Sequence, residues 1–186
     1  MEKYQNTIGI VINKKTVKET DLLITLLTPQ YGKIIALAKG AKNIKSSRLS
    51  SLQLGNTIKV QLYKKNDYVW LSEAKTIIPF LQFDKSLTQI NLLFYFLEIL
   101  NRLIAENQQI EGIFRISQEI VDAINQNQLN RYIKNEILFL ETLGFGVPEE
   151  INKYFQKKDY KTTQQLIKGF FESIIEKPLE SNKLFK

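Results

Sequence analysis

The sequence predicts an α+β fold in which an all-β part is followed by an all-α part. Residues 1–79 contain short segments in which apolar and polar residues alternate, separated by turn-forming residues. After Pro79 the apolar residues recur at helical spacing instead. The 186 residues can bury a core without disulfides. We therefore expect a five-stranded barrel over residues 1–79 and a helical bundle domain over residues 80–186.

The five strands follow from period-2 alternation between turns. They are expected at Thr7–Lys14, Asp21–Thr28, within Tyr31–Lys39, at Thr57–Lys65 and at Tyr68–Ser72. Their inward faces are expected to carry Ile8, Ile10 and Ile12, then Ile34, Ala36 and Ala38, then Ile58, Val60 and Leu62. Val11 falls on the outward face in this scheme, and Asn66-Asp67 is expected to turn the fourth strand into the fifth.

Four helices are expected in the second half. Ser86 and Gln89 form a capping-box pattern ahead of a helix that is apolar around most of its circumference between Leu92 and Leu100. Further helices are expected over 113–124, over 129–140 with Gly144 just past the end, and from Thr162, capped by Gln165, to just before Pro178.

A basic loop follows the third strand. Gly40 can adopt positive φ, and small polar residues surround the cations that follow it. Such a loop is suited to gripping a phosphate backbone, although a solvated hairpin whose lysines only maintain solubility fits the same pattern. The candidate contacts in and before this loop are Lys33, Lys39, Lys42, Lys45 and Arg48.

The outward face of the fourth strand adds a second candidate surface. Lys59, Tyr63 and Lys65 interleave cations with a ring on which a base could stack. Trp70 on the next strand either extends this platform or is buried against the helical half, and the second alternative is favoured.

The positive charge is concentrated in the first half of the chain. Residues 1–79 hold 13 basic and 5 acidic residues, a net charge of +8, whereas the remaining 13 basic and 14 acidic residues give −1. Most of the cations are lysines, which act as point charges rather than bidentate forks. Nucleic-acid binding is therefore expected to be directed at the backbone and weakly selective for sequence.

The composition argues against most enzyme chemistry. The sequence has no Cys and no His, which excludes thiolate and imidazole nucleophiles, bases and ligands. Glu19 and Asp21 alone are weak evidence for a Mg²⁺ site, and turn or salt-bridge roles are commoner. We expect a protein that is not an enzyme, has no cofactor or metal, and is cytoplasmic, since no apolar run is long enough to span a bilayer.

Several short motifs occur in the order and spacing of a known family. They are Gly9-Ile10-Val11, Glu19-Thr20-Asp21, Tyr31-Gly32-Lys33, Ala38-Lys39-Gly40-Ala41, Ser47-Arg48, Leu71-Ser72-Glu73-Ala74, Leu97-Glu98-Ile99-Leu100 and Leu143-Gly144-Phe145. In these motifs the chain resembles the bacterial recombination-mediator family RecO, in a form shorter than typical relatives.

The resemblance implies an N-terminal oligonucleotide-binding (OB) barrel followed by a helical domain. It also implies a role in DNA repair and recombination after DNA damage: binding of single- and double-stranded DNA, strand annealing and assistance in loading the recombinase. The family's motif positions imply DNA contacts at Lys33, Lys39, Lys42 and Arg48. Many relatives insert a four-cysteine zinc module where this chain has GFGVPEEINKYF, so no zinc is expected.

The implied partners are RecR and the C-terminal tail of single-strand-DNA-binding protein. An acidic, apolar tail would need cations at the rim of an apolar pocket. The candidates for this role are Arg102, Arg115, Arg131 and Lys134. Two alternatives to the DNA hypothesis are an RNA-binding OB module acting in translation and a scaffold whose barrel has lost DNA binding.

Overall fold

The computed structural model describes residues 4–65, 68–80 and 85–181. The chain divides into a barrel unit, Met1–Asp84 with Ile104–Gln109, and a helical unit, Lys85–Leu103 with Ile110–Lys186. The sequence pattern placed 104–109 among the helices, whereas the structure groups this segment with the strands. The turn expected at Asn66-Asp67 lies outside the described residues.

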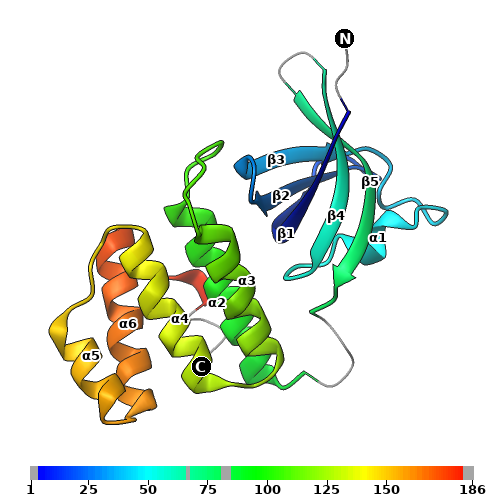
Figure 1. Cartoon of the computed structure of the whole chain (residues 1–186). Coiled ribbons are helices and arrows are strands. Elements are labelled where there is room, and N and C mark those ends of the chain that lie inside the picture. Colours follow the sequence, from blue (N-terminus) through cyan, green and yellow to red (C-terminus); the bar gives the residue numbers. More distant parts are fainter. Residues whose placement is uncertain (1–3, 66–67, 81–84, 182–186) are drawn as a thin grey trace. The chain divides into compact units, whose positions relative to one another are not determined.

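The barrel unit is a closed five-stranded barrel with the order β1-β2-β3-β5-β4 (Figure 1). The strands are β1 Tyr4–Thr16, β2 Leu22–Thr28, β3 Gly32–Ala38, β4 Thr57–Lys65 and β5 Tyr68–Ile78. A short helix, α1 Arg48–Ser51, follows the basic loop and was not expected from the sequence. The expected five-stranded barrel is confirmed, with β5 extending beyond the expected end at Ser72.

The barrel core confirms most of the expected inward faces. The expected inward residues of β3 and β4 all belong to one buried apolar cluster with Leu22, Ile24, Leu26 and Leu71. The expectation for β1 was wrong: Val11 belongs to this core, whereas Ile8, Ile10 and Ile12 do not. In register with β4, Ile8 pairs with the outward Lys59 and Gly9 with the inward Ile58. The register of β1 against β2 shifts between Val11 and Asn13. This shift lies after Val11 and does not set its face, because Thr7 and Gly9 already pair with the inward Val60 and Ile58. Ile10 and Val11 are both fully buried, so alternation alone could not show which face of β1 lines the barrel.

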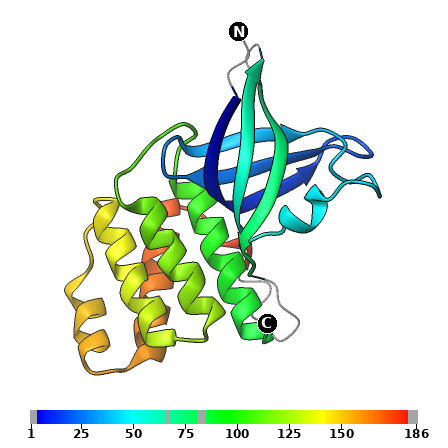
Figure 2. The same cartoon turned by 45° about the vertical axis from the view of Figure 1, so that its right-hand side comes forward.

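The contact between β3 and β5 is the short seam of the barrel. These strands are parallel and have one registered pair, Leu37 with Trp70, whereas β4 and β5 run side by side over most of their length (Figure 2). The segment 104–109 packs on β3, where the Asn107 N–H donates to the Lys33 carbonyl at 2.7 Å. Gly32 has φ +63°, and a Cβ there would lie 1.9 Å from the Gln108 carbonyl oxygen. This approach therefore requires glycine.

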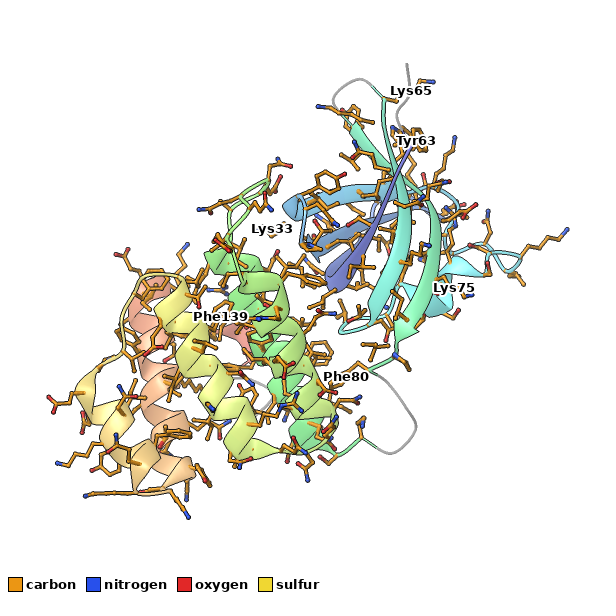
Figure 3. The ribbon with its side chains drawn as sticks, viewed as in Figure 1. Lys33, Tyr63, Lys65, Lys75, Phe80 and Phe139 are labelled. Carbon is orange, nitrogen blue, oxygen red and sulfur yellow. The ribbon has the colours of Figure 1, made fainter. Side chains whose placement is uncertain are left out.

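The helical unit contains five helices among the described residues. They are α2 Leu87–Leu103, α3 Ile113–Asn125, α4 Leu129–Thr142, α5 Glu149–Gln156 and α6 Tyr160–Ile175. The Ser86–Gln89 capping box is confirmed: Gln89 N–H donates to Ser86 Oγ at 3.3 Å and Ser86 N–H to Gln89 Oε1 at 3.1 Å. Phe139 is fully buried between the rings of Phe96 and Phe171 (Figure 3).

Two features of the helices differ from the sequence expectation: the start of α6 and the presence of α5. The cap of α6 is Asp159, which accepts from the Thr162 N–H at 3.1 Å, so the expected Thr162–Gln165 box was wrong. The helix α5 was missed although Ile151, Tyr154 and Phe155 recur at helical spacing, because its eight residues give only a short pattern. Gly144 ends α4 in the expected role, with φ +81°.

No helix of the described residues is both long and apolar enough to cross a membrane.

A buried carboxyl group lies in the core of the helical unit. Glu136 on α4 has no exposed surface, and Tyr132 Oη donates to its Oε1 at 2.6 Å. Burial raises the pKa of Glu136 from 4.5 to about 8, against the lowering effect of the Tyr132 hydrogen bond. The folded protein therefore holds this proton at pH values at which the unfolded chain has lost it.

We predict that the stability of the helical unit falls as the pH rises from about 5 to about 9, since the folded state binds more protons in this window. Deprotonation of Glu136 across this window should lower the free energy of unfolding by up to roughly 5 kcal/mol. Glu136→Gln should flatten the pH dependence measured by urea unfolding, whereas Glu141→Gln, at an exposed position on the same helix, should not. A wild-type slope retained in Glu136→Gln would contradict this assignment.

Candidate nucleic-acid interface

An open groove of about 910 Å³ lies on the outer surface of the barrel unit. One wall is the basic loop, which we define as residues 39–48, and the floor is formed by β4 and β5, with Asn6 from β1. Among the described residues, the lining includes four cations and one carboxylate: Lys45, Arg48, Lys59, Lys75 and Glu73. The remaining lining is mostly hydroxyl and amide groups. The groove is therefore polar, with an excess of positive charge.

Arg48 fixes the basic loop to the barrel. Its Nη2 donates to the Lys39 carbonyl at 2.6 Å, and its Nη1 donates to the carbonyls of Leu71 at 3.2 Å and Ser72 at 3.4 Å. Lys39 directly follows β3, and Leu71 and Ser72 belong to β5. The guanidinium thus bridges the two strands of the short seam, a geometry that needs several donors in a planar fork.

The Leu71 and Ser72 carbonyls that accept from Arg48 lie at a bulge in β5. Gln61 pairs with Glu73 and Leu62 with Leu71, so Ser72 has no partner residue on β4. The extra residue of a bulge interrupts the ladder and leaves backbone groups that need other partners. Arg48 supplies one partner, and Ser72 Oγ donates to the Gln61 carbonyl at 3.1 Å.

The start of the loop is held by Asp21. The Gly40 N–H donates to Asp21 Oδ1 at 2.7 Å, and the Lys42 N–H donates to the Thr20 carbonyl at 2.9 Å. Gly40 has φ +64°, as its place in the loop predicted. Asp21 is buried, so it serves the turn, which is the commoner of the two roles considered for Glu19 and Asp21. No group of three His, Cys, Asp or Glu side chains that could hold a metal occurs within the described ranges.

Two lysines of the groove floor face each other across strands. Lys59 on β4 and Lys75 on β5 are paired in register, and both are exposed. Directly opposed residues of an antiparallel pair have Cβ atoms only about 4.5–5.5 Å apart, so like charges there are destabilising. Lys75 was missed because we ended the fifth strand at Ser72. Extending the alternation from the inward Leu71 would also have placed Lys75 on the inward face, because the bulge at Ser72 is what brings it to the outer surface.

The aromatic residues lie farther along the same two strands. Tyr63 and Trp70 are register partners, and their rings stack with centroids 6.1 Å apart and planes 12° apart. Trp70 therefore packs on Tyr63 within the barrel unit. Figure 3 shows Tyr63 and Lys65 toward one end of β4 and Lys75 toward the other end of the β4–β5 pair. Neither Tyr63 nor Lys65 lines the groove.

The other predicted DNA contacts do not gather in the groove. Lys39 and Lys42 are exposed on the basic loop but outside its lining. Lys33 is only 7% exposed, because segment 104–109 lies against it. Burial lowers the pKa of Lys33, and the Glu106 carboxylate opposes this shift. Lys33 is thus not on an open surface, contrary to the expectation that it faces DNA directly.

The four cations proposed for partner binding fall into two groups. Arg102 pairs with Glu98 at 2.6 Å, and Arg131 pairs with Glu119 and with Asp122. Arg115 and Lys134 are exposed, and no hydrogen bond or ion pair connects either to another described residue. Glu98 also accepts the N–H groups of residues 180 and 181, both at 2.9 Å, so it anchors the end of the described chain.

The region where the resemblance implies a zinc module in many relatives is helical here. It contains the end of α4, the glycines at 144 and 146, and α5. Because the sequence has no cysteine, a four-cysteine site cannot form.

The strand order, closure and helical second unit define an oligonucleotide-binding (OB) barrel protein with a C-terminal helical unit. Residues 1–80 match the family model "Recombination protein O N terminal". The barrel unit thus matches a RecO family model, and the chain is similar to curated relatives of that name.

Three of these relatives are each named DNA repair protein RecO. The protein of Thermoanaerobacter sp. (strain X514) is 26% identical over 127 residues, which are 68% of this chain and 51% of that protein. The protein of Acetivibrio thermocellus is 29% identical over 146 residues, 77% of this chain and 58% of that protein. The protein of Chloroherpeton thalassium is 29% identical over 147 residues, which are 76% of this chain and 56% of that protein. The chain thus spans about half the length of the curated relatives it matches.

We predict that Arg48→Lys destabilises the barrel by roughly 1–3 kcal/mol, because an ammonium group cannot donate to carbonyls of both seam strands in the geometry of the guanidinium. Amide hydrogen exchange should accelerate in residues 39–47. Lys42→Ala, an exposed change in the same loop, should alter stability by less than about 0.5 kcal/mol. Unchanged exchange in the loop of Arg48→Lys would show that this residue does not hold it.

Proposed function

We propose that this chain is a DNA-repair protein that binds DNA through the groove beneath the basic loop of its OB barrel. The observation that carries the proposal is the open, polar groove with four cations on a barrel of the class that binds oligonucleotides. Lysines supply most of this charge, so the contacts are directed at phosphates and depend little on sequence. The names of the relatives support the DNA-repair role.

Once DNA is bound, the proposed activity is that of a non-enzymatic, cytoplasmic mediator. Annealing of complementary strands needs charge neutralisation and close approach but no bond chemistry. Assistance in recombinase loading with RecR belongs to the same proposal. For the acidic tail of single-strand-DNA-binding protein, Arg115 and Lys134 are now the better candidates, because Arg102 and Arg131 are already paired.

The test of DNA binding is a titration of a labelled single strand at several salt concentrations. If about three to five phosphates are neutralised, log affinity should fall with log salt with a slope of roughly −2 to −3.5. Strands of different sequence should bind within a few-fold of one another, because the groove offers mainly charge.

Two other outcomes separate the alternatives. Absence of salt-dependent binding would contradict the proposal and favour a scaffold. Much tighter binding of a matched RNA strand would indicate recognition of the 2′-hydroxyl and an RNA-binding function instead.

A further inference from the structure

We propose that Lys59 and Lys75 form a phosphate-binding pair on the floor of the groove, and that its ligand is a phosphodiester of a nucleic-acid backbone. This inference rests on the proposed function and specifies where the backbone is held. Neither lysine is needed by the fold, since both are exposed on the outer face of the barrel.

The pairing of the two lysines opposes the stability of the free protein. Directly opposed residues on antiparallel strands interact more strongly than most surface pairs, and two like charges at this position destabilise the sheet. An anion between the two ammonium groups converts this repulsion into two favourable contacts. Two like charges that destabilise the free protein, with no opposite charge paired to them, are typical of a binding site.

The neighbours of the pair do not neutralise it. On the other side of Lys59, β1 contributes Ile8 as the register partner. Glu73 lies two residues from Lys75 on β5 and lines the same groove, yet among the described residues no ion pair connects it to either lysine. Lys45 of the basic loop adds a third cation to the lining. The floor therefore keeps a net positive charge in the free protein.

The rest of the groove suits a polymer better than an isolated anion. Its volume of about 910 Å³ is at the upper end for small-molecule pockets and far exceeds the needs of one phosphate. Asn6, Gln61 and Asn43 line it beside the lysines and can donate to or accept from sugars and base edges. A phosphate on the lysine pair would thus place adjoining nucleotides against these amides.

Charge reversal at one lysine separates binding from stability. Lys75→Glu should lower the affinity for labelled single-stranded DNA at least tenfold and make the salt dependence shallower. The same change replaces a repulsive cross-strand pair by an attractive one, so the melting temperature of the protein should rise by about 1–4 °C. Lys64→Glu is the matched control, because Lys64 is exposed on β4 outside the groove and faces Val69.

Two neutral variants complete the test. Lys59→Gln and Lys75→Gln should each weaken binding less than charge reversal does, and Glu73→Gln should strengthen it, since it removes the carboxylate from the lining. The titrations are repeated with a duplex: a loss shared by both forms supports a contact to the common backbone, and a loss restricted to one form supports the pair as that form's site.

The outcomes distinguish the two proposals. If the wild-type protein binds no DNA, the proposed function fails, and with it the basis of this inference. If the wild type binds but the variants at 59 and 75 bind as tightly as Lys64→Glu does, DNA is held elsewhere and the lysine pair is refuted. Weaker binding accompanied by a lower melting temperature in every variant would make the pair structural and would also overturn it.

Discussion

The groove depends on one set of hydrogen bonds, those from the Arg48 guanidinium to carbonyl oxygens on both sides of the barrel seam. The strands β3 and β5 share one registered pair, and Ser72, the extra residue of the bulge, has no partner residue on β4. Arg48 donates to the carbonyls of Leu71 and Ser72 and, through its bond to the Lys39 carbonyl, holds the basic loop beside β4 and β5. The closure of the barrel and the shape of the candidate site therefore have a common cause. An arginine whose donors are used in this way contributes charge to the groove while serving mainly to position its wall.

Much of the fold was accessible from the sequence, because the relevant signals are local. The inward faces of β3 and β4 follow from alternation, and the start of α2 follows from the Ser86–Gln89 capping box. The errors occur where a local rule is broken by tertiary context. In β1, Ile10 and Val11 are both fully buried, and only the register with the other strands shows that Val11 faces the barrel core. The docking of 104–109 on β3 depends on a clash that only Gly32 avoids, and no periodicity reveals it.

The candidate site was predicted less well than the fold. The sequence identified Lys45, Arg48 and Lys59, because charge and strand alternation mark them directly, and these three do line the groove. It could not foresee that Arg48 is occupied by backbone carbonyls or that Lys33 is covered, since both depend on segments far apart in the chain. Lys75 was missed because the fifth strand was ended too early and because the bulge at Ser72 reverses the alternation before it. The residue types thus indicated a surface that can bind phosphates. The strand register and the closure of the barrel determine which of the cations line the same groove.

The central claim is that the phosphate path follows the groove and not the outer face of β2 and β3, where many OB barrels bind oligonucleotides. The most direct measurement is a map of backbone amide chemical shifts in the labelled protein as a single DNA strand is added. The account predicts that the largest changes fall in three stretches: residues 43–48, 59–61 and 72–75. Changes concentrated instead in residues 23–27 and 33–37, with the groove unaffected, would contradict it.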